Sequence, residues 1–249
     1  MRILLVNDDG IFAEGINILA KELTKNHEVY ICAPKGEQSG MSQALSVGIP
    51  LRVKVENLPI SVKKAFSIDG RPADCTKLAL EVLLKDEQID MVISGINKGA
   101  NLGTDVLYSG TVGAALEGYN HKVRSLAVSV SSKSEISFEQ IAKIVASKLD
   151  DFCKTDNLFM YNINFPIELN SGKIEFVFTK QGFRRYENEF DTVVLDDGSI
   201  AYKMQGRAKD IGNDEFTKCE RKAPKFIYGD ISSLKNNDSI SLFFIVLYF

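Results

Sequence analysis

Two polar clusters follow apolar stretches that are typical of buried strands. The sequence Asn7-Asp8-Asp9-Gly10 comes after residues 2–6, and residues 95–101 come after residues 90–94. Adjacent acids beyond a strand end can turn toward one point, where their charges repel unless a cation or a proton joins them. Since no histidine or cysteine lies beside them, the available ligands are oxygens, which suit Mg²⁺, Mn²⁺ or Ca²⁺. An N-cap followed by a solvated acid is the other interpretation of the acid pair.

A third polar segment, Tyr108-Ser109-Gly110-Thr111, leads into a predicted helix at residues 113–118. Free backbone N–H groups and the helix dipole favour a phosphate at such a helix start, although a Ser-Gly-Thr segment before a helix, when it is taken alone, is more often simple capping. The segment lacks the lysine of a P-loop, and the first strand lacks the glycine pattern of a dinucleotide site. A hard cation beside a phosphate site is typical of enzymes that catalyse phosphoryl transfer or phosphate-ester hydrolysis.

The elements that must position these clusters alternate between strand and helix. The first βαβ unit consists of a strand at residues 2–6, a helix that ends near residue 26, and a strand at residues 28–33. This unit predicts a parallel pair of strands with a right-handed crossover. The alternation continues with predicted strands at 51–56, 62–68, 90–94, 125–131 and 158–164. Helices are predicted at 76–84, opened by Pro72-Ala73-Asp74-Cys75, at 113–118, continuing a helix after Ser109-Gly110-Thr111, and at 138–152. This pattern predicts a doubly wound, mostly parallel, Rossmann-like α/β sheet with ligands at the carboxyl ends of its strands.

The pattern changes near residue 170. Residues 174–180 and 192–204 are typical of long hairpin strands around the turn Asp196-Asp197-Gly198. We therefore predict a catalytic core at residues 1–170 and a β-hairpin extension at residues 171–249. The last nine residues are strongly apolar but too few to cross a bilayer as a helix.

Composition narrows the class of protein. Thirty basic residues against 33 acidic ones give a net charge of −3 over 249 residues, which is too balanced for a protein that coats nucleic acid or an anionic membrane. The amino terminus has no signal-peptide core, so a cytoplasmic location is predicted. Four cysteines without metal-type spacing indicate free thiols in a reducing compartment, and two histidines leave little material for a zinc site or a Ser-His-Asp triad.

Three ordered motifs point to one family. They are Asn7-Asp8-Asp9-Gly10, Ser94-Gly95-Ile96-Asn97-Lys98-Gly99-Ala100-Asn101-Leu102-Gly103 and Tyr108-Ser109-Gly110-Thr111-Val112-Gly113-Ala114-Ala115. Further matches are Ala33-Pro34 with Ser39-Gly40, Arg71-Pro72-Ala73-Asp74-Cys75 and Asn164-Phe165-Pro166. With these motifs the chain strongly resembles the survival protein E (SurE) family of metal-dependent phosphatases that act on nucleoside monophosphates.

The resemblance implies a set of site residues. The family's metal ligands fall on two carboxylates, a hydroxyl and an amide, namely Asp8, Asp9, Ser39 and Asn97. Of these, Asp8, Asp9 and Asn97 are the expected catalytic residues. The expected phosphate contacts are Asn101, Ser109, Gly110 and Thr111. One divalent ion per subunit is implied, Mg²⁺ or Mn²⁺, with Ca²⁺ as a substitute in crystals. All four ligands are hard, in agreement with the argument from the acid pair.

The resemblance also implies an activity and an assembly. The expected enzyme is a 5′-nucleotidase in which water attacks the phosphate in line, with 3′-nucleotidase and exopolyphosphatase side activities. The family's carboxyl-terminal extension is exchanged between subunits, which gives a homodimer or a homotetramer. Residues 229–241 match the family's ending only in a degraded form, and the tail holds no histidine. The sequence therefore leaves the oligomeric state open.

There are three alternatives: two modules from other functional classes and one phosphatase with a different chemistry. A receiver-like signalling module also begins with a strand and an acid pair, but residues 50–58 contain no aspartate to accept a phosphoryl group. A haloacid-dehalogenase-type phosphatase needs an Asp-x-Asp pattern, whereas the two acids here are adjacent. A non-catalytic nucleotide-binding module is the remaining alternative, and metal-dependent phosphate release would separate it from a phosphatase.

Overall fold

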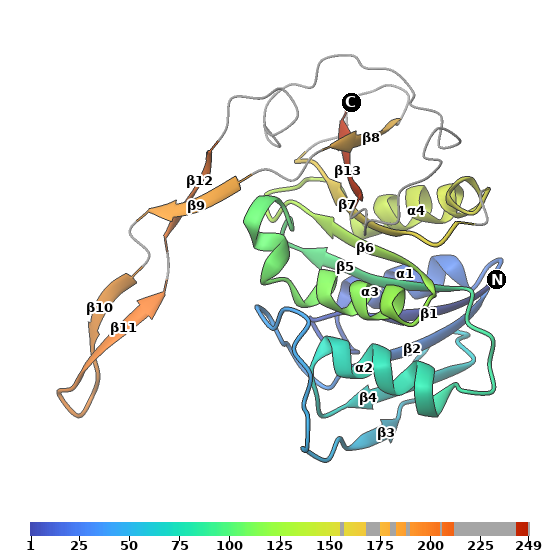
Figure 1. Ribbon diagram of the computed structural model, residues 1–249, viewed down its shortest axis with the longest axis horizontal. Helices are drawn as coiled ribbons and strands as arrows, with labels where there is room; N and C mark the ends of the chain where they lie inside the picture. The colour runs from blue at the N-terminus through green and yellow to red at the C-terminus, as the bar shows by residue number, and fades with distance from the viewer. Residues whose placement is uncertain are drawn as a thin grey trace.

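The computed structural model describes residues 1–154, 157–167, 175–179, 183–187, 190–204, 206–211 and 243–248. Its centre is a nine-stranded sheet of order β3-β4-β2-β1-β5-β6-β7-β13-β8 (Figure 1). The strands are β1 (Arg2–Val6), β2 (Glu28–Pro34), β3 (Val53–Val55), β4 (Lys64–Ile68), β5 (Met91–Lys98), β6 (Arg124–Val130), β7 (Met160–Phe165), β8 (Glu175–Thr179) and β13 (Phe243–Tyr248). The pairs from β4 to β13 are parallel, and β3 and β8 close the two edges in antiparallel fashion.

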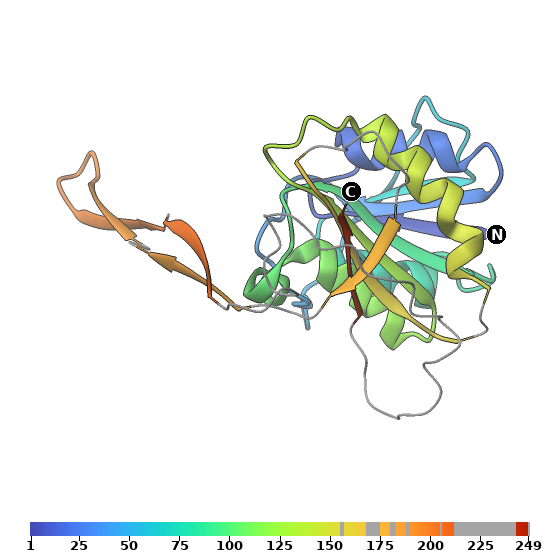
Figure 2. The ribbon, with the colours of Figure 1, turned by 90° about the horizontal axis from the view of Figure 1, so that it is seen from above.

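Helices cover both faces of the sheet (Figure 2). One face carries α1 (Glu14–Leu23) and α4 (Phe138–Phe152), which pack against each other. The other face carries α2 (Pro72–Leu78) and α3 (Gly110–Asn120). A π-helical turn, η1 (Ala79–Leu83), extends α2, and a 3₁₀ turn, η2 (Gly103–Leu107), precedes α3. The predicted doubly wound α/β fold is thus confirmed.

The core explains why β1 is apolar at four successive positions, from Ile3 to Val6. In β1, Ile3 and Leu5 belong to the apolar cluster under α1 and α4, whereas Leu4 and Val6 belong to the cluster under α2. A strand that is covered on both faces has no solvent side, so it shows a continuous apolar run. Its polar residues are therefore placed beyond its end, at the carboxyl edge of the sheet.

The starts of two helices follow from groups that cap them. The predicted helix after Ser109-Gly110-Thr111 is confirmed: α3 begins at Gly110, and Ser109 caps it. The prediction that Pro72-Ala73-Asp74-Cys75 opens a helix is also confirmed, because proline suits the first helical position of α2 and the Asp74 carboxylate accepts a hydrogen bond from the Arg71 N–H. In both cases a cap rather than the apolar pattern sets the first turn.

An arm projects from the body of the molecule (Figures 1 and 2). Its inner part pairs β9 (Phe183–Glu187) with β12 (Arg207–Ile211), and its outer part is the hairpin of β10 (Phe190–Val194) and β11 (Ile200–Met204). The predicted turn at residues 196–198 is confirmed. The prediction that residues 174–180 share this hairpin is wrong, because β8 pairs with β13 at the edge of the main sheet.

The sequence-based division at residue 170 stays a prediction, although two strands from beyond it, β8 and β13, lie in the main sheet. The tail motif at residues 229–241 and Cys219 lie outside the described residues. The other three cysteines, Cys32, Cys75 and Cys153, are free. Among the described residues, no helix has both the length and the apolar character to cross a membrane, and the cytoplasmic location stays a prediction.

Candidate metal and phosphate site

The acid pair lies in a tight turn directly after β1. The Asn7 side chain closes this turn: its Nδ2 donates to the Gly10 carbonyl over 2.9 Å, and its Oδ1 accepts from the Gly10 N–H over 3.2 Å. Gly10 has a φ of +100°, a backbone conformation that residues other than glycine rarely adopt. The turn therefore fixes the backbone of Asp8 and Asp9 at the carboxyl edge of the sheet.

Asp8 meets the start of α3. The Thr111 hydroxyl donates to Asp8 Oδ1 over 2.6 Å, and both side chains are buried. Gly110 allows this approach, because a Cβ at that position would lie 2.9 Å from the Cβ of Asp8. The structure thus brings together the first and third polar clusters of the sequence, which are about 100 residues apart in the chain.

Negative charge is concentrated at this point. Burial raises the pKa of the Asp8 carboxyl, and the hydrogen bond from Thr111 opposes only part of that effect. Burial also raises the pKa of Asp9 to about 6, with further contributions from the charges of Asp8 and Glu37. Carboxylates in this situation gain stability from a bound cation or a proton.

The loop that carries Ser39 crosses the same edge. The Gln38 N–H donates to the Asp8 carbonyl over 2.7 Å, so the loop lies against the end of β1. The Ser39 hydroxyl is exposed and donates to Glu37 Oε1 over 2.8 Å. Glu37 was not among the residues predicted from the sequence. Its position two residues before Ser39 in a polar loop was the one available signal.

The loop continues toward α3. Ser42 contributes two hydrogen bonds: its N–H donates to the Tyr108 carbonyl over 2.9 Å, and its hydroxyl donates to the Leu107 carbonyl over 2.6 Å. Further along, the Ser46 hydroxyl donates to Asp74 Oδ2 over 2.7 Å. Hydrogen bonds therefore fix the loop to the end of η2 through Ser42 and to α2 through Ser46.

Asn97 lies in β5, which extends four residues further than predicted and has a register shift against β6 between Gly95 and Asn97. Because β5 pairs with β1, its end lies at the edge that holds Asp8. The Asn97 Nδ2 donates to the Gly99 carbonyl over 2.7 Å, so the amide nitrogen is already engaged and the amide oxygen is the atom suited to a cation.

Ser109 and Asn101 have structural partners as well as their predicted role. The Ser109 hydroxyl accepts from the Val112 N–H over 3.1 Å and caps α3, as the capping interpretation predicted. The Asn101 side chain is buried and donates to the Ser129 hydroxyl over 2.8 Å. Capping and anion binding are compatible at Ser109, because a cap occupies only one of the free N–H groups of the first turn.

Among the described residues, no group of three or more His, Cys, Asp and Glu side chains could hold a metal ion by itself. A cation at the acid pair would therefore need neutral oxygens in addition to the two carboxylates. The hydroxyl of Ser39 and the amide oxygen of Asn97 are oxygens of this kind, and both are hard ligands.

Comparison with known proteins places the chain in a family. The family model "Survival protein SurE" matches residues 3–188. This chain belongs to the SurE family. The 5′-nucleotidase SurE of Alkaliphilus metalliredigens is 40% identical over 220 residues, which cover 86% of this chain and 85% of the relative. The 5′-nucleotidase SurE of Pelotomaculum thermopropionicum is 42% identical over 217 residues, which cover 86% and 82%.

The fold agrees with that of a solved SurE structure. The crystal structure of the SurE protein from Aquifex aeolicus matches with a TM-score of 0.66 and 28% identity, and the match covers 100% of this chain and 93% of that one. All eight predicted SurE site residues lie within the matched range of residues 3–188, as do Glu37 and the loop around it.

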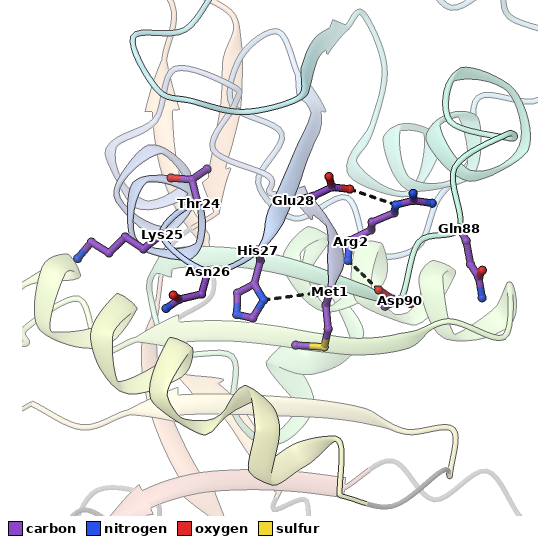
Figure 3. Close-up of a pocket in the computed structure, with 9 residues that line it drawn as sticks. All are labelled: Met1, Arg2, Thr24, Lys25, Asn26, His27, Glu28, Gln88 and Asp90. Atoms are coloured by element: carbon purple, nitrogen blue, oxygen red, sulfur yellow. Dashed lines mark hydrogen bonds and ion pairs between the residues drawn. The ribbon is translucent and has the colours of Figure 1, made fainter.

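A hollow of about 650 Å³ in this SurE chain lies at the opposite end of the sheet strands (Figure 3). It is formed around the amino ends of β1 and β2. Several of its polar groups contact one another: Arg2 Nε lies 3.1 Å from Glu28, and the Arg2 N–H donates to Asp90 over 2.7 Å. The amino group of Met1 lies 3.5 Å from the His27 ring. This hollow is separate from the candidate site, where the acid pair and the helix start meet.

Proposed function

We propose that this chain is a metal-dependent phosphomonoesterase that hydrolyses nucleoside monophosphates to nucleoside and inorganic phosphate. The contact between Asp8 and Thr111 carries the proposal, because it joins an acid pair to the start of a helix. The first group suits a cation and the second suits a phosphate. The curated relatives named 5′-nucleotidase SurE support the 5′-nucleotidase activity in particular.

The residues at the acid pair fit one divalent ion, Mg²⁺ or Mn²⁺. Burial raises the pKa values of both aspartates, and a cation beside them would stabilise their charged forms. The residues that would hold the ion are Asp8, Asp9, Ser39 and Asn97. When bound, such an ion neutralises charge that develops on the phosphate oxygens in the transition state.

The protein's own groups position the phosphate. The N–H groups of Gly110 and Thr111 belong to the first turn of α3, where the intrahelical acceptors are missing. Together with the Ser109 hydroxyl and the Asn101 amide, they hold phosphate oxygens and orient the ester. A water molecule attacks phosphorus in line and the bond to the nucleoside oxygen breaks. One proton of the water passes to that oxygen, which leaves as an alcohol, and the other stays on the phosphate.

We propose that the arm is exchanged between subunits of a homodimer or homotetramer. Large apolar side chains of the arm are exposed in the single chain, namely those of Phe190, Val194, Leu195, Ile200, Tyr202 and Met204. An exposed apolar surface of this kind marks an interaction site. The balanced net charge gives no support to a nucleic-acid polymer or a membrane as partner.

Phosphate release from a panel of substrates tests the function. Nucleoside 5′- and 3′-monophosphates and a short polyphosphate are each incubated with Mg²⁺, Mn²⁺ or EDTA, for the wild type and Asp9→Asn. We expect metal-dependent release from 5′-monophosphates that falls by about 100-fold or more in the variant, because charge and positioning dominate phosphoryl transfer. Release by Asp9→Asn at the wild-type rate would reject the site, and absence of release with every metal would leave a nucleotide-binding protein.

A further inference from the structure

Two asparagines lie inside β7, where their residue type is unexpected. Asn162 and Asn164 are buried in a strand that is paired on both sides by β6 and β13. Asparagine is depleted in strands, and a buried polar side chain costs free energy unless it is hydrogen-bonded. Positions at which a sequence opposes both strand propensity and burial are commonly functional.

Both asparagines are directed at one residue outside their strand. Asn164 engages both backbone groups of Asn101: its Oδ1 accepts from the Asn101 N–H over 2.8 Å, and its Nδ2 donates to the Asn101 carbonyl over 3.2 Å. Asn162 Nδ2 donates to the same carbonyl over 2.9 Å. A side-chain amide that matches an N–H and a C=O in this way replaces the pairing that a neighbouring strand would supply.

Ser129 of β6 completes the arrangement. It is fully buried, lies beside Asn164 in the sheet register and accepts from Asn101 Nδ2 over 2.8 Å. One of the two N–H groups of the Asn101 amide is thereby occupied, and the plane of the amide is fixed. The direction of the second N–H group follows from the first, because an amide group is planar.

Of the two polar atoms in the Asn162 side chain, the nitrogen has a hydrogen-bond partner and the oxygen does not. Its Oδ1 is buried without a hydrogen-bond partner, which destabilises the folded chain. Packing alone would be served better by an apolar side chain of similar size at this position. The donor that Asn162 supplies to the Asn101 carbonyl is the gain that accounts for an asparagine here.

We propose that Ser129, Asn162 and Asn164, the β6–β7 trio, are positioning residues that hold Asn101 so that its second amide N–H meets the substrate phosphate. This inference rests on the proposed function. According to this proposal, residues of β6 and β7 position the phosphate contact Asn101, although the acid pair itself follows β1. The segment after β5 is held there by buried hydrogen bonds, so its amide needs no reorganisation when the phosphate binds.

The test measures binding of inorganic phosphate by calorimetry to the Mn²⁺-loaded protein. Ser129→Ala removes the partner of the Asn101 amide, and Asn164→Asp replaces the donor to the Asn101 carbonyl by an oxygen that repels it. We expect each variant to bind phosphate about tenfold more weakly, the loss of roughly one hydrogen bond to a charged group. The affinity for Mn²⁺ should remain within about twofold of the wild type, since the trio does not touch the acid pair.

The chain offers a matched control in the same strand. Ser125 is also a buried serine of β6, but its hydroxyl donates to the Val123 carbonyl at the other end of the strand. Ser125→Ala therefore removes a buried hydrogen bond without reaching Asn101, and we expect unchanged phosphate binding. An equal loss in Ser125→Ala and Ser129→Ala would overturn the proposal in favour of a structural role. Since Ser129→Ala is a small change, the test does not depend on the folding of Asn164→Asp.

A double-mutant cycle separates this proposal from the proposed function. If Ser129 acts through the Asn101 side chain, Ser129→Ala should not weaken phosphate binding further in an Asn101→Ala background. An additive loss would overturn the proposal. Failure of the wild type to release phosphate from nucleotides would reject the phosphatase. If the variants of the trio weaken phosphate binding only when Asn101 is present, the positioning role is supported, whether or not the wild type releases phosphate from nucleotides.

Discussion

At the scale of single residues, Asp8 is the point at which three separate parts of the chain meet. Its backbone carbonyl accepts from Gln38, its carboxylate accepts from Thr111, and its Cβ approaches Gly110. The first contact comes from the loop around Gln38, and the other two come from the first turn of α3. The geometry of the acid pair therefore depends on residues that are not ligands themselves.

Replacement of Thr111 by valine tests this dependence. Thr111→Val keeps the shape of the side chain but leaves Asp8 Oδ1 without its 2.6 Å donor in a buried position. We expect a loss of stability of about 1–3 kcal/mol in urea unfolding and a fall in turnover of a nucleoside monophosphate of about tenfold or more. Thr111→Ser keeps the hydroxyl and should retain most of the turnover. Similar losses in both variants would mean that the hydroxyl contact is not what matters.

Gly110→Ala tests how closely the helix must approach. The added Cβ would lie 2.9 Å from Asp8 Cβ and 3.1 Å from Pro72 Cγ, so α3 or the acid turn must shift. We expect destabilisation of about 1–3 kcal/mol and weaker Mn²⁺ binding by calorimetry, because the acid pair moves. Gly36→Ala is the matched control, since a Cβ there meets nothing within 4 Å. Unchanged Mn²⁺ binding in Gly110→Ala would show that the contact is not required.

At the scale of elements, the sequence was most informative where pattern and burial agree. The continuous apolar run of residues 2–6 and the spacing of residues 138–152 gave β1 and α4, because each element is defined by the face it buries. The partner of β8 could not be predicted, since pairing between distant strands leaves no local trace. The same reason hid the role of Asn162 and Asn164, whose partner lies some 60 residues earlier in the chain.

The end of α3 makes a pH-dependent contact with η1. His121 Nε2 lies 2.9 Å from Glu81 and its Nδ1 lies 3.4 Å from Glu117. Burial alone would lower the pKa of His121, but the hydrogen bonds to Glu81 and to the Glu117 carbonyl, together with the Glu117 charge, raise it above its ordinary value. The protonated form is therefore stabilised by folding. This contribution is fully present below about pH 6.5 and is lost as the pH rises through the higher folded pKa.

Urea unfolding at pH 6 and pH 8.5 checks the sign of this effect. We expect His121→Gln to lose more stability relative to the wild type at pH 6 than at pH 8.5. His27, the other histidine, is the control, because burial and then the charge of the amino terminus lower its pKa. His27→Gln should therefore lose more stability relative to the wild type at pH 8.5 than at pH 6. A pH-independent difference for His121→Gln would contradict the contact.

At the scale of the whole molecule, the arm is connected to the site through η2. Arg184 Nη1 in β9 lies 3.0 Å from Asp105 Oδ2, and the Tyr186 hydroxyl donates to Asp105 Oδ1 over 2.9 Å. The Thr104 hydroxyl donates to the Arg184 carbonyl over 2.6 Å. Because η2 leads directly into Ser109, the base of the arm and the phosphate-binding turn share one support.

Substitution at the outer hairpin tests whether the arm assembles subunits. Val194 and Ile200 face each other across β10 and β11, and their exposed fractions are 68% and 65%. A stable interface buries about 800 Å² on each partner, which an apolar hairpin can supply when it is covered by a second copy of the chain. We expect the wild type to sediment as a dimer or tetramer and the double variant Val194→Asp, Ile200→Asp to sediment as a monomer.

The double variant should keep its Mn²⁺ affinity, since the acid pair is formed within one chain. Asp196→Asn at the tip of the hairpin is the control and should leave the assembly unchanged. A wild type that sediments as a monomer, or a double variant that still assembles, would show that the arm serves another purpose.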